Sequence, residues 1–170
     1  MSFPDTLSRW HDFYITAGTT SATLVGLLFV GISLHVRIVA THVDVRRLAR
    51  VTLSTFVAVV MISLIMLVPS DRAAETGLYL TWASLISLAL IIPSAIAALW
   101  TDRRRALPRS VLVIRFGLVL VTFVGASVAG VVLTNGDLID AFNLLFGAVL
   151  LMLVVSVRNT WELLVTLAAK

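Results

Sequence analysis

The sequence predicts an all-α membrane protein, a bundle of five transmembrane helices with the N-terminus outside and the C-terminus in the cytoplasm. The chain of 170 residues is 59% hydrophobic and only 13% charged, whereas soluble domains carry roughly 25% charged residues. A soluble globule of this size buries only about 68–70% of its unfolded surface, which would leave too much apolar surface in water. Apolar runs of roughly 20 residues, the length that crosses a hydrocarbon core, recur five times.

We expect a single integral membrane domain over residues 1–170, because only short connections separate the apolar runs. The first run is too long for the apolar part of a signal peptide, and no small-residue cleavage site follows it. The five predicted spans are residues 13–36, 51–69, 77–100, 111–134 and 138–157.

Basic residues are distributed unevenly between the two sides. Eleven of the 13 Lys and Arg residues lie in or next to the segments after the first, third and fifth spans, and only Arg9 and Arg72 lie on the other side. Since cytoplasmic loops are enriched in Lys and Arg, these segments are predicted to face the cytoplasm across the cell inner (plasma) membrane. These basic residues also explain the sequence pI near 10.7. Because they are expected to contact anionic lipid headgroups, we expect no nucleic-acid partner.

The segment before the first span is predicted to be helical. Ser2 is typical of a helix N-cap. Four large apolar residues then recur at helical spacing, namely Phe3, Leu7, Trp10 and Tyr14. This pattern predicts a short helix that lies in the outer interface before the chain turns inward.

The next helix boundaries are marked by capping and helix-breaking residues. Asp44 can cap the second helix and Pro69 ends it. Pro93 lies inside the third span, where it predicts a kink. Pro108 stands where a helix-opening proline belongs, just before the fourth span.

The fourth and fifth spans are predicted to form an antiparallel hairpin. The turn centres on Gly136, which suits the left-handed position after a helix end. Reflection about this residue places Gly125 opposite Gly147, where small residues allow close helix packing.

Two intramembrane polar residues lie on this hairpin. Asn143 is expected to form a hydrogen bond across it. Arg115 lies near enough to the cytoplasmic interface for its side chain to extend there, with Asn159 or Glu162 as candidate partners.

Patterns of catalytic or cofactor-binding residues are missing from the sequence. There is no HExxH, GxSxG or Walker A motif and no glycine-rich dinucleotide fingerprint. The chain has no cysteine, and none of its 3 histidines has a second ligand three or four residues away. We therefore expect no enzymatic activity, no cofactor and no metal.

The first span carries a polar face that is unusual for a membrane helix. At about 100° per residue, hydroxyl groups line its outer half and apolar side chains its inner half, with an acid at the outer end and a cation at the inner end. This arrangement suits a pore wall with a hydrophobic gate. The candidate pore-lining residues are Asp12, Thr16, Thr19, Thr23, Val30 and Arg37.

A ridge of small residues runs beside this face. Gly18, Ala22 and Gly26 follow the small-xxx-small spacing that lets membrane helices pack closely. Hydroxyl residues clustered with Gly and Ala are also common at buried helix interfaces, where they bond carbonyls of their own helix. The polar face is therefore either a packing seam or the wall of a conduit.

The first span also resembles a known group of proteins. Residues 13–35 carry the pattern FYxxxGxxSATLxGLLFVxISLH. This stretch is similar to the first membrane helix of small uncharacterised prokaryotic multi-span integral membrane proteins. The resemblance is limited to that helix and implies a membrane-embedded chain without a known activity.

A five-helix bundle of this size encloses little space, so a conduit would have to form in an oligomer. We predict an oligomeric channel or transport subunit in the lipid bilayer, with the first span facing the axis and an ion or small solute as the permeant. The alternative is a non-catalytic membrane scaffold or assembly partner that docks through the glycine ridge.

Overall fold

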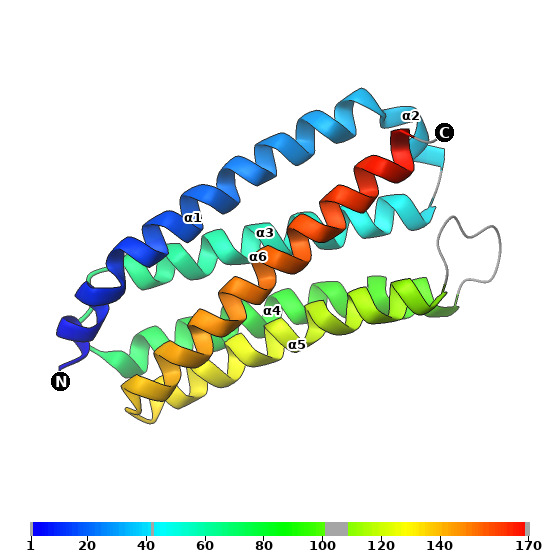
Figure 1. The fold of residues 1–170 in the computed structure, drawn as a ribbon. Coiled ribbons are helices and arrows are strands. Elements are labelled where there is room, and N and C mark those ends of the chain that lie inside the picture. Colours follow the sequence, from blue (N-terminus) through cyan, green and yellow to red (C-terminus); the bar gives the residue numbers. More distant parts are fainter. Residues whose placement is uncertain (1, 42, 101–108, 169–170) are drawn as a thin grey trace.

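The computed structural model describes residues 2–41, 43–100 and 109–168, and all secondary structure in these ranges is α-helical (Figure 1). Five helices are long and apolar enough to cross a membrane, which confirms this part of the fold prediction. The helices are α1 (Phe3–Leu34), α2 (Val36–Thr41), α3 (Val43–Leu67), α4 (Ala73–Trp100), α5 (Arg109–Thr134) and α6 (Leu138–Ala168).

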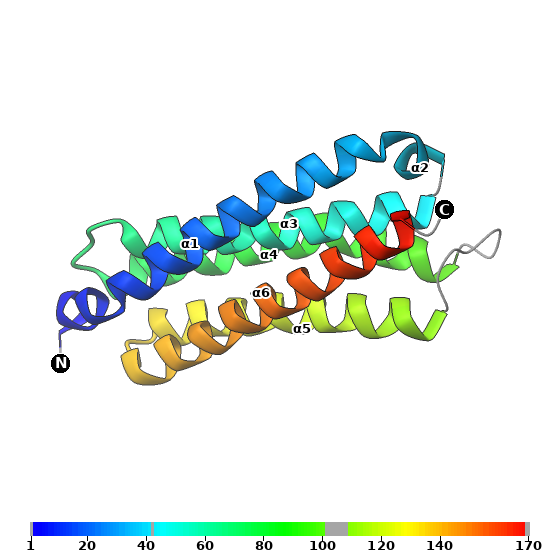
Figure 2. The ribbon, with the colours of Figure 1, turned by 45° about the horizontal axis from the view of Figure 1, so that its top comes forward.

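The five long helices run alternately up and down (Figure 1). One end of the bundle, here called the N-terminal end, holds the start of α1 and the α3–α4 and α5–α6 turns. The opposite end, here called the α2 end, holds α2 and the last turns of α6. Helix α3 contacts α1, α4 and α6, whereas α1 packs mainly against α3 and forms one edge of the bundle (Figure 2).

The N-terminal segment is part of α1 rather than a separate interfacial helix, so that prediction was wrong. Ser2 does cap α1, because its Oγ accepts the backbone N–H of Asp5 at 3.3 Å. The aromatic rings of the segment pack on α6, with Phe3 6.3 Å from Phe142 between ring centroids. Contact with α6 therefore covers this apolar face and keeps α1 continuous.

Several boundaries differ from the predicted ones. The described part of helix α3 begins at Val43, so Asp44 lies inside its first turn. Pro93 is exposed and lies within α4, which is assigned as one helix throughout. Helix α6 continues past the membrane span predicted to end at residue 157 and runs to Ala168, which agrees with the expectation that the tail extends the fifth helix. Pro108 and the arginines at 103–105 lie outside the described residues.

The α5–α6 hairpin forms as predicted around its glycine turn. Gly136 has φ +88°, the left-handed conformation that glycine adopts without strain. The predicted register is off by one residue, because a Cβ at Gly125 would meet Ala148 at 3.7 Å. Gly147 is exposed, with nothing within 4 Å of a Cβ built there. The helices cross with Gly125 against Ala148 and Gly147 turned outward.

The closest helix approach lies between α4 and α5, at a glycine pair that sequence reasoning missed. A Cβ at Gly130 would lie 2.8 Å from the carbonyl oxygen of Gly77, and a Cβ at Gly77 would lie 2.6 Å from the carbonyl oxygen of Gly130. Each glycine is followed four residues later by a threonine, Thr81 or Thr134, whose hydroxyl donates to that glycine's carbonyl. The backbones are in direct contact, which only glycine at both positions permits.

Candidate functional site

Five of the six predicted pore-lining residues lie on the outer surface of α1, whereas Arg37 lies on α2, because α1 ends at Leu34. All six are exposed, and none points into the core of the chain: Asp12, Thr16, Thr19, Thr23, Val30 and Arg37. In the most apolar window of α1 only 17% of residues are buried, compared with 50% in α3. The polar face is therefore not a seam against another helix of the same chain.

The hydroxyl groups on this face make few hydrogen bonds within the chain. Thr23 Oγ1 donates to the carbonyl of Thr19 at 2.9 Å. The hydroxyls of Thr16, Thr19 and Thr20 have no hydrogen-bond partner in the described part of the chain. Helix α1 thus presents several unpaired hydroxyls on one exposed side.

The small-residue ridge of α1 is divided between two environments. Gly18 faces α3, where a Cβ would lie 2.9 Å from Ser63 Cβ. Ala22 and Gly26 are exposed, and a Cβ at Gly26 would have nothing within 4 Å. Only the first member of the ridge packs inside the chain, while the other two stay open beside the polar face.

Ser21 attaches α1 to α3, a role that the sequence analysis did not assign. Its Oγ donates to the carbonyl oxygen of Phe56 at 2.8 Å, and the residue is fully buried. The signal for it was its position between Gly18 and Leu28, on the helix side opposite the exposed threonines.

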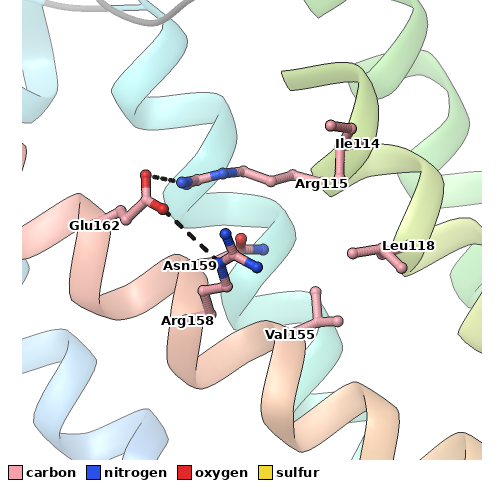
Figure 3. A pocket seen from close by; sticks show the side chains of 7 residues that line it. All are labelled: Ile114, Arg115, Leu118, Val155, Arg158, Asn159 and Glu162. Atoms are coloured by element: carbon pink, nitrogen blue, oxygen red, sulfur yellow. Dashed lines mark ion pairs between the residues drawn. The ribbon is translucent and has the colours of Figure 1, made fainter. Parts of the chain in front are cut away.

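Arg115 is buried near the α2 end and makes an ion pair with Glu162 of α6 (Figure 3). Of the two candidate partners, Asn159 and Glu162, the structure thus pairs Arg115 with Glu162. The side chain is only 7% exposed, so it is covered by the protein, and its reach to the cytoplasmic interface stays a prediction. Arg158 Nε lies 4.0 Å from Oε1 of the same glutamate, and its side chain is 74% exposed.

A pocket of about 110 Å³ lies between α5 and α6 at this ion pair. Two buried donors of its lining residues have no hydrogen-bond partner, Nη1 of Arg115 and Nδ2 of Asn159. Asn159 is 1% exposed. The lining residues are Ile114, Arg115, Leu118, Val155, Arg158, Asn159 and Glu162 (Figure 3).

Sequence reasoning found this cluster only in part. Val155, Asn159 and Glu162 follow helical spacing on one face of α6, and the hairpin reflection brings that face to Arg115. The combination of spacing and reflection indicated which side chains meet. It did not indicate that two donors remain unpaired, because that depends on the rotamers inside the pocket.

Asn143 does not bridge the hairpin as predicted. Its side chain is exposed and makes no hydrogen bond within the described residues. Asn143 lies on the exposed side of α6 together with Gly147, whereas Phe142 and Leu145 face the core, so its side chain points away from α5.

Within residues 2–41, 43–100 and 109–168, no group of three or more His, Asp or Glu side chains is placed so that it could hold a metal ion. Two features remain: the exposed polar face of α1 and the Arg115–Asn159 pocket. They lie on different helices and present different chemistry. Comparisons with protein-family models, curated proteins and solved structures found no match to this chain.

Proposed function

We propose that this chain is a non-enzymatic multi-pass protein of the plasma membrane whose copies assemble through α1 into a channel or transport unit. The observation that carries the proposal is the exposed polar face of α1. In this assembly the α1 face of each copy borders a central axis, and an ion or small solute passes along it.

Charge supports the orientation of the bundle in the bilayer. Arg37 lies in α2, Arg46 and Arg50 lie in the first turns of α3 at the α2 end, and all three are exposed. The acids Asp5, Asp12, Asp71, Glu75, Asp137 and Asp140 lie at the N-terminal end. By the positive-inside rule the α2 end faces the cytoplasm and the N-terminal end faces outward.

Hydrogen bonding argues that the α1 face meets something other than lipid. Hydrocarbon offers no partner for a hydroxyl. Since those of Thr16, Thr19 and Thr20 make no bond to their own backbone in the described residues, only water or another chain is left to satisfy them. Because these residues point away from the core of their own chain, a water-filled path lined by them exists only between copies.

The inner half of the same face supplies an apolar constriction. Val30 is 58% exposed and Leu34 is 76% exposed. Rings of such side chains around an axis close a pore by excluding water. Asp12 and Arg37 stand at the outer and inner ends of the path, where they set which charge enters.

Cysteine labelling in native membranes tests the proposal directly, because the chain has no cysteine of its own. Single cysteines at Thr16, Thr19 and Thr23 are expected to react with a membrane-impermeant thiol reagent added from outside. Val121→Cys and Val128→Cys are matched controls, since both side chains are exposed on α5 but are expected to face lipid, where thiols stay unreactive. Absence of labelling at all three threonine positions would exclude a water-filled path along α1.

The scaffold function is the second candidate, and the open positions on the ridge favour it. Ala22 and Gly26 are exposed and leave room for a close helix contact. Ala22→Ile is expected to abolish oligomer formation in mild detergent in either function. Loss of the oligomer combined with unlabelled threonines would favour the scaffold, and an oligomer that survives the substitution would contradict both.

A further inference from the structure

The pocket between α5 and α6 combines buried hydrogen-bond donors with positive charge. Arg115 Nη1 and Asn159 Nδ2 are both buried and unpaired. Buried polar groups have a hydrogen-bond partner in the great majority of cases. Two buried donors without a partner beside one cavity therefore indicate a missing acceptor. Both donors belong to side chains that line the cavity, and rotation about their terminal bonds turns them toward an occupant.

The charges around the pocket select the sign of that occupant. Of the lining residues, two are arginines and one is a glutamate. Glu162 pairs with Arg115, while Arg158 lies only at the 4.0 Å limit of an ion pair with it. Since Arg158 is 74% exposed, its guanidinium is free to move toward an anion in the pocket.

We infer that this pocket binds a phosphate group, with Arg115 and Asn159 donating to its oxygens and Arg158 closing over it. Phosphate oxygens match the planar donor set of arginine. The pocket volume of about 110 Å³ is several times larger than the ~10–15 Å³ that one water molecule needs. The inference rests on α5 and α6 and does not depend on the function proposed for α1.

The apolar side of the pocket indicates what carries the phosphate. Ile114, Leu118 and Val155 line it beside the polar groups, and Ile114 is 60% exposed. In the proposed orientation this end of the bundle lies at the cytoplasmic headgroups, where basic pockets between helices bind lipid phosphates. An anionic phospholipid headgroup and free inorganic phosphate share the required chemistry, and the experiment separates these two sources.

The first arm of the test measures lipid. The purified full chain is reconstituted in nanodiscs containing phosphatidylglycerol and phosphatidylcholine, and retained lipids are counted by native mass spectrometry after transfer to detergent. The second arm measures inorganic phosphate as a shift in thermal unfolding midpoint in detergent, against chloride at equal ionic strength. Enrichment of phosphatidylglycerol identifies the headgroup, and a phosphate-dependent shift alone identifies the free anion.

Asn159→Leu removes one donor and keeps the side-chain size. It is expected to weaken the binding found in either arm about tenfold, since hydrogen bonds to charged groups are strong. Asn143→Leu is the matched control, because Asn143 lies on the same helix, is exposed and is far along the chain from the pocket. Arg158→Gln, at an exposed position that cannot disturb the core, is expected to weaken binding in the same direction.

Glu162→Gln provides a test of opposite sign. Glutamine keeps an acceptor for Arg115 but removes the negative charge beside the anion, so binding is expected to tighten at least about threefold. A purely structural role of the cluster predicts no such gain. The inference is overturned if neither lipid enrichment nor a phosphate-dependent shift is seen, or if Asn159→Leu and Asn143→Leu bind equally well.

Discussion

The α4–α5 contact and the α1 face show two opposite uses of small residues. At the first, Gly77 and Gly130 bring two backbones into contact, and each neighbouring threonine bonds within its own helix. On α1, Ala22 and Gly26 have the same small size but remain exposed. The small residues of the α4–α5 contact pack inside the folded chain, whereas those of α1 remain available for a contact with another chain.

The largest expected effect comes from breaking the α4–α5 contact. Gly130→Leu places a side chain against the carbonyl oxygen of Gly77, 2.8 Å from the position of its Cβ, and neither backbone can yield cheaply. We expect a loss of about 3 kcal/mol in the free energy of unfolding, measured by SDS titration. Gly147→Leu is the control, because nothing lies within 4 Å there. Equal stabilities of the two variants would show that the glycine pair does not hold the bundle.

A smaller loss is expected at the α5–α6 ion pair. Arg115→Leu removes the buried partner of the Glu162 carboxylate and leaves the more distant Arg158 at 4.0 Å. Since the Glu162 side chain is 36% exposed, solvent screening limits the cost to about 1–2 kcal/mol. The double variant Arg115→Leu/Glu162→Leu is expected to regain most of this loss. A double variant no more stable than the single one would mean that the loss comes from the pair itself and not from the carboxylate left without its buried partner.

The two regions also differ in how far the sequence predicts them. Hydropathy predicted the helices, and the left-handed glycine predicted the α5–α6 turn, because both are properties of local sequence. Gly77 and Gly130 lie near the ends of α4 and α5 that are far from the segment joining these helices, so no tight turn fixed their register. The repeated Gly-x-x-x-Thr spacing, from Gly77 to Thr81 and from Gly130 to Thr134, was the only local signal of their contact.

The residues of the two candidate sites also differ in how well the sequence predicts them. The partner of Arg115 could be predicted because a short turn fixes the register between its two helices. The exposure of α1 could not, since helical periodicity places Thr16 and Thr19 on one face without saying what that face meets. The aromatic contacts that join Phe3 and Trp10 to α6 arise from tertiary packing, and hydrophobic periodicity alone assigned that face to the lipid interface.

A loss of stability smaller than that at the Arg115–Glu162 ion pair is expected where α1 is attached to α3. Ser21→Ala removes the buried bond to the carbonyl of Phe56, which is expected to cost about 1 kcal/mol. Ser33→Ala is the control, because the Ser33 hydroxyl only bonds the carbonyl of Phe29 in its own helix and is exposed. Thermal unfolding of the detergent-solubilised chain gives the comparison. Identical midpoints would mean that α1 is held by apolar contacts alone.

The smallest effect on folding is expected on the exposed face itself. Thr16→Val and Thr19→Val replace hydroxyls that have no partner in the described chain, so the stability of the isolated monomer is expected to change by less than about 0.5 kcal/mol. Assembly in native lipid is expected to weaken if another chain or ordered water satisfies these groups, which blue-native electrophoresis measures. A destabilised monomer would show that the hydroxyls act within one chain. Since the same residues would then be part of folding, the distinction between α1 and the α4–α5 contact would no longer hold.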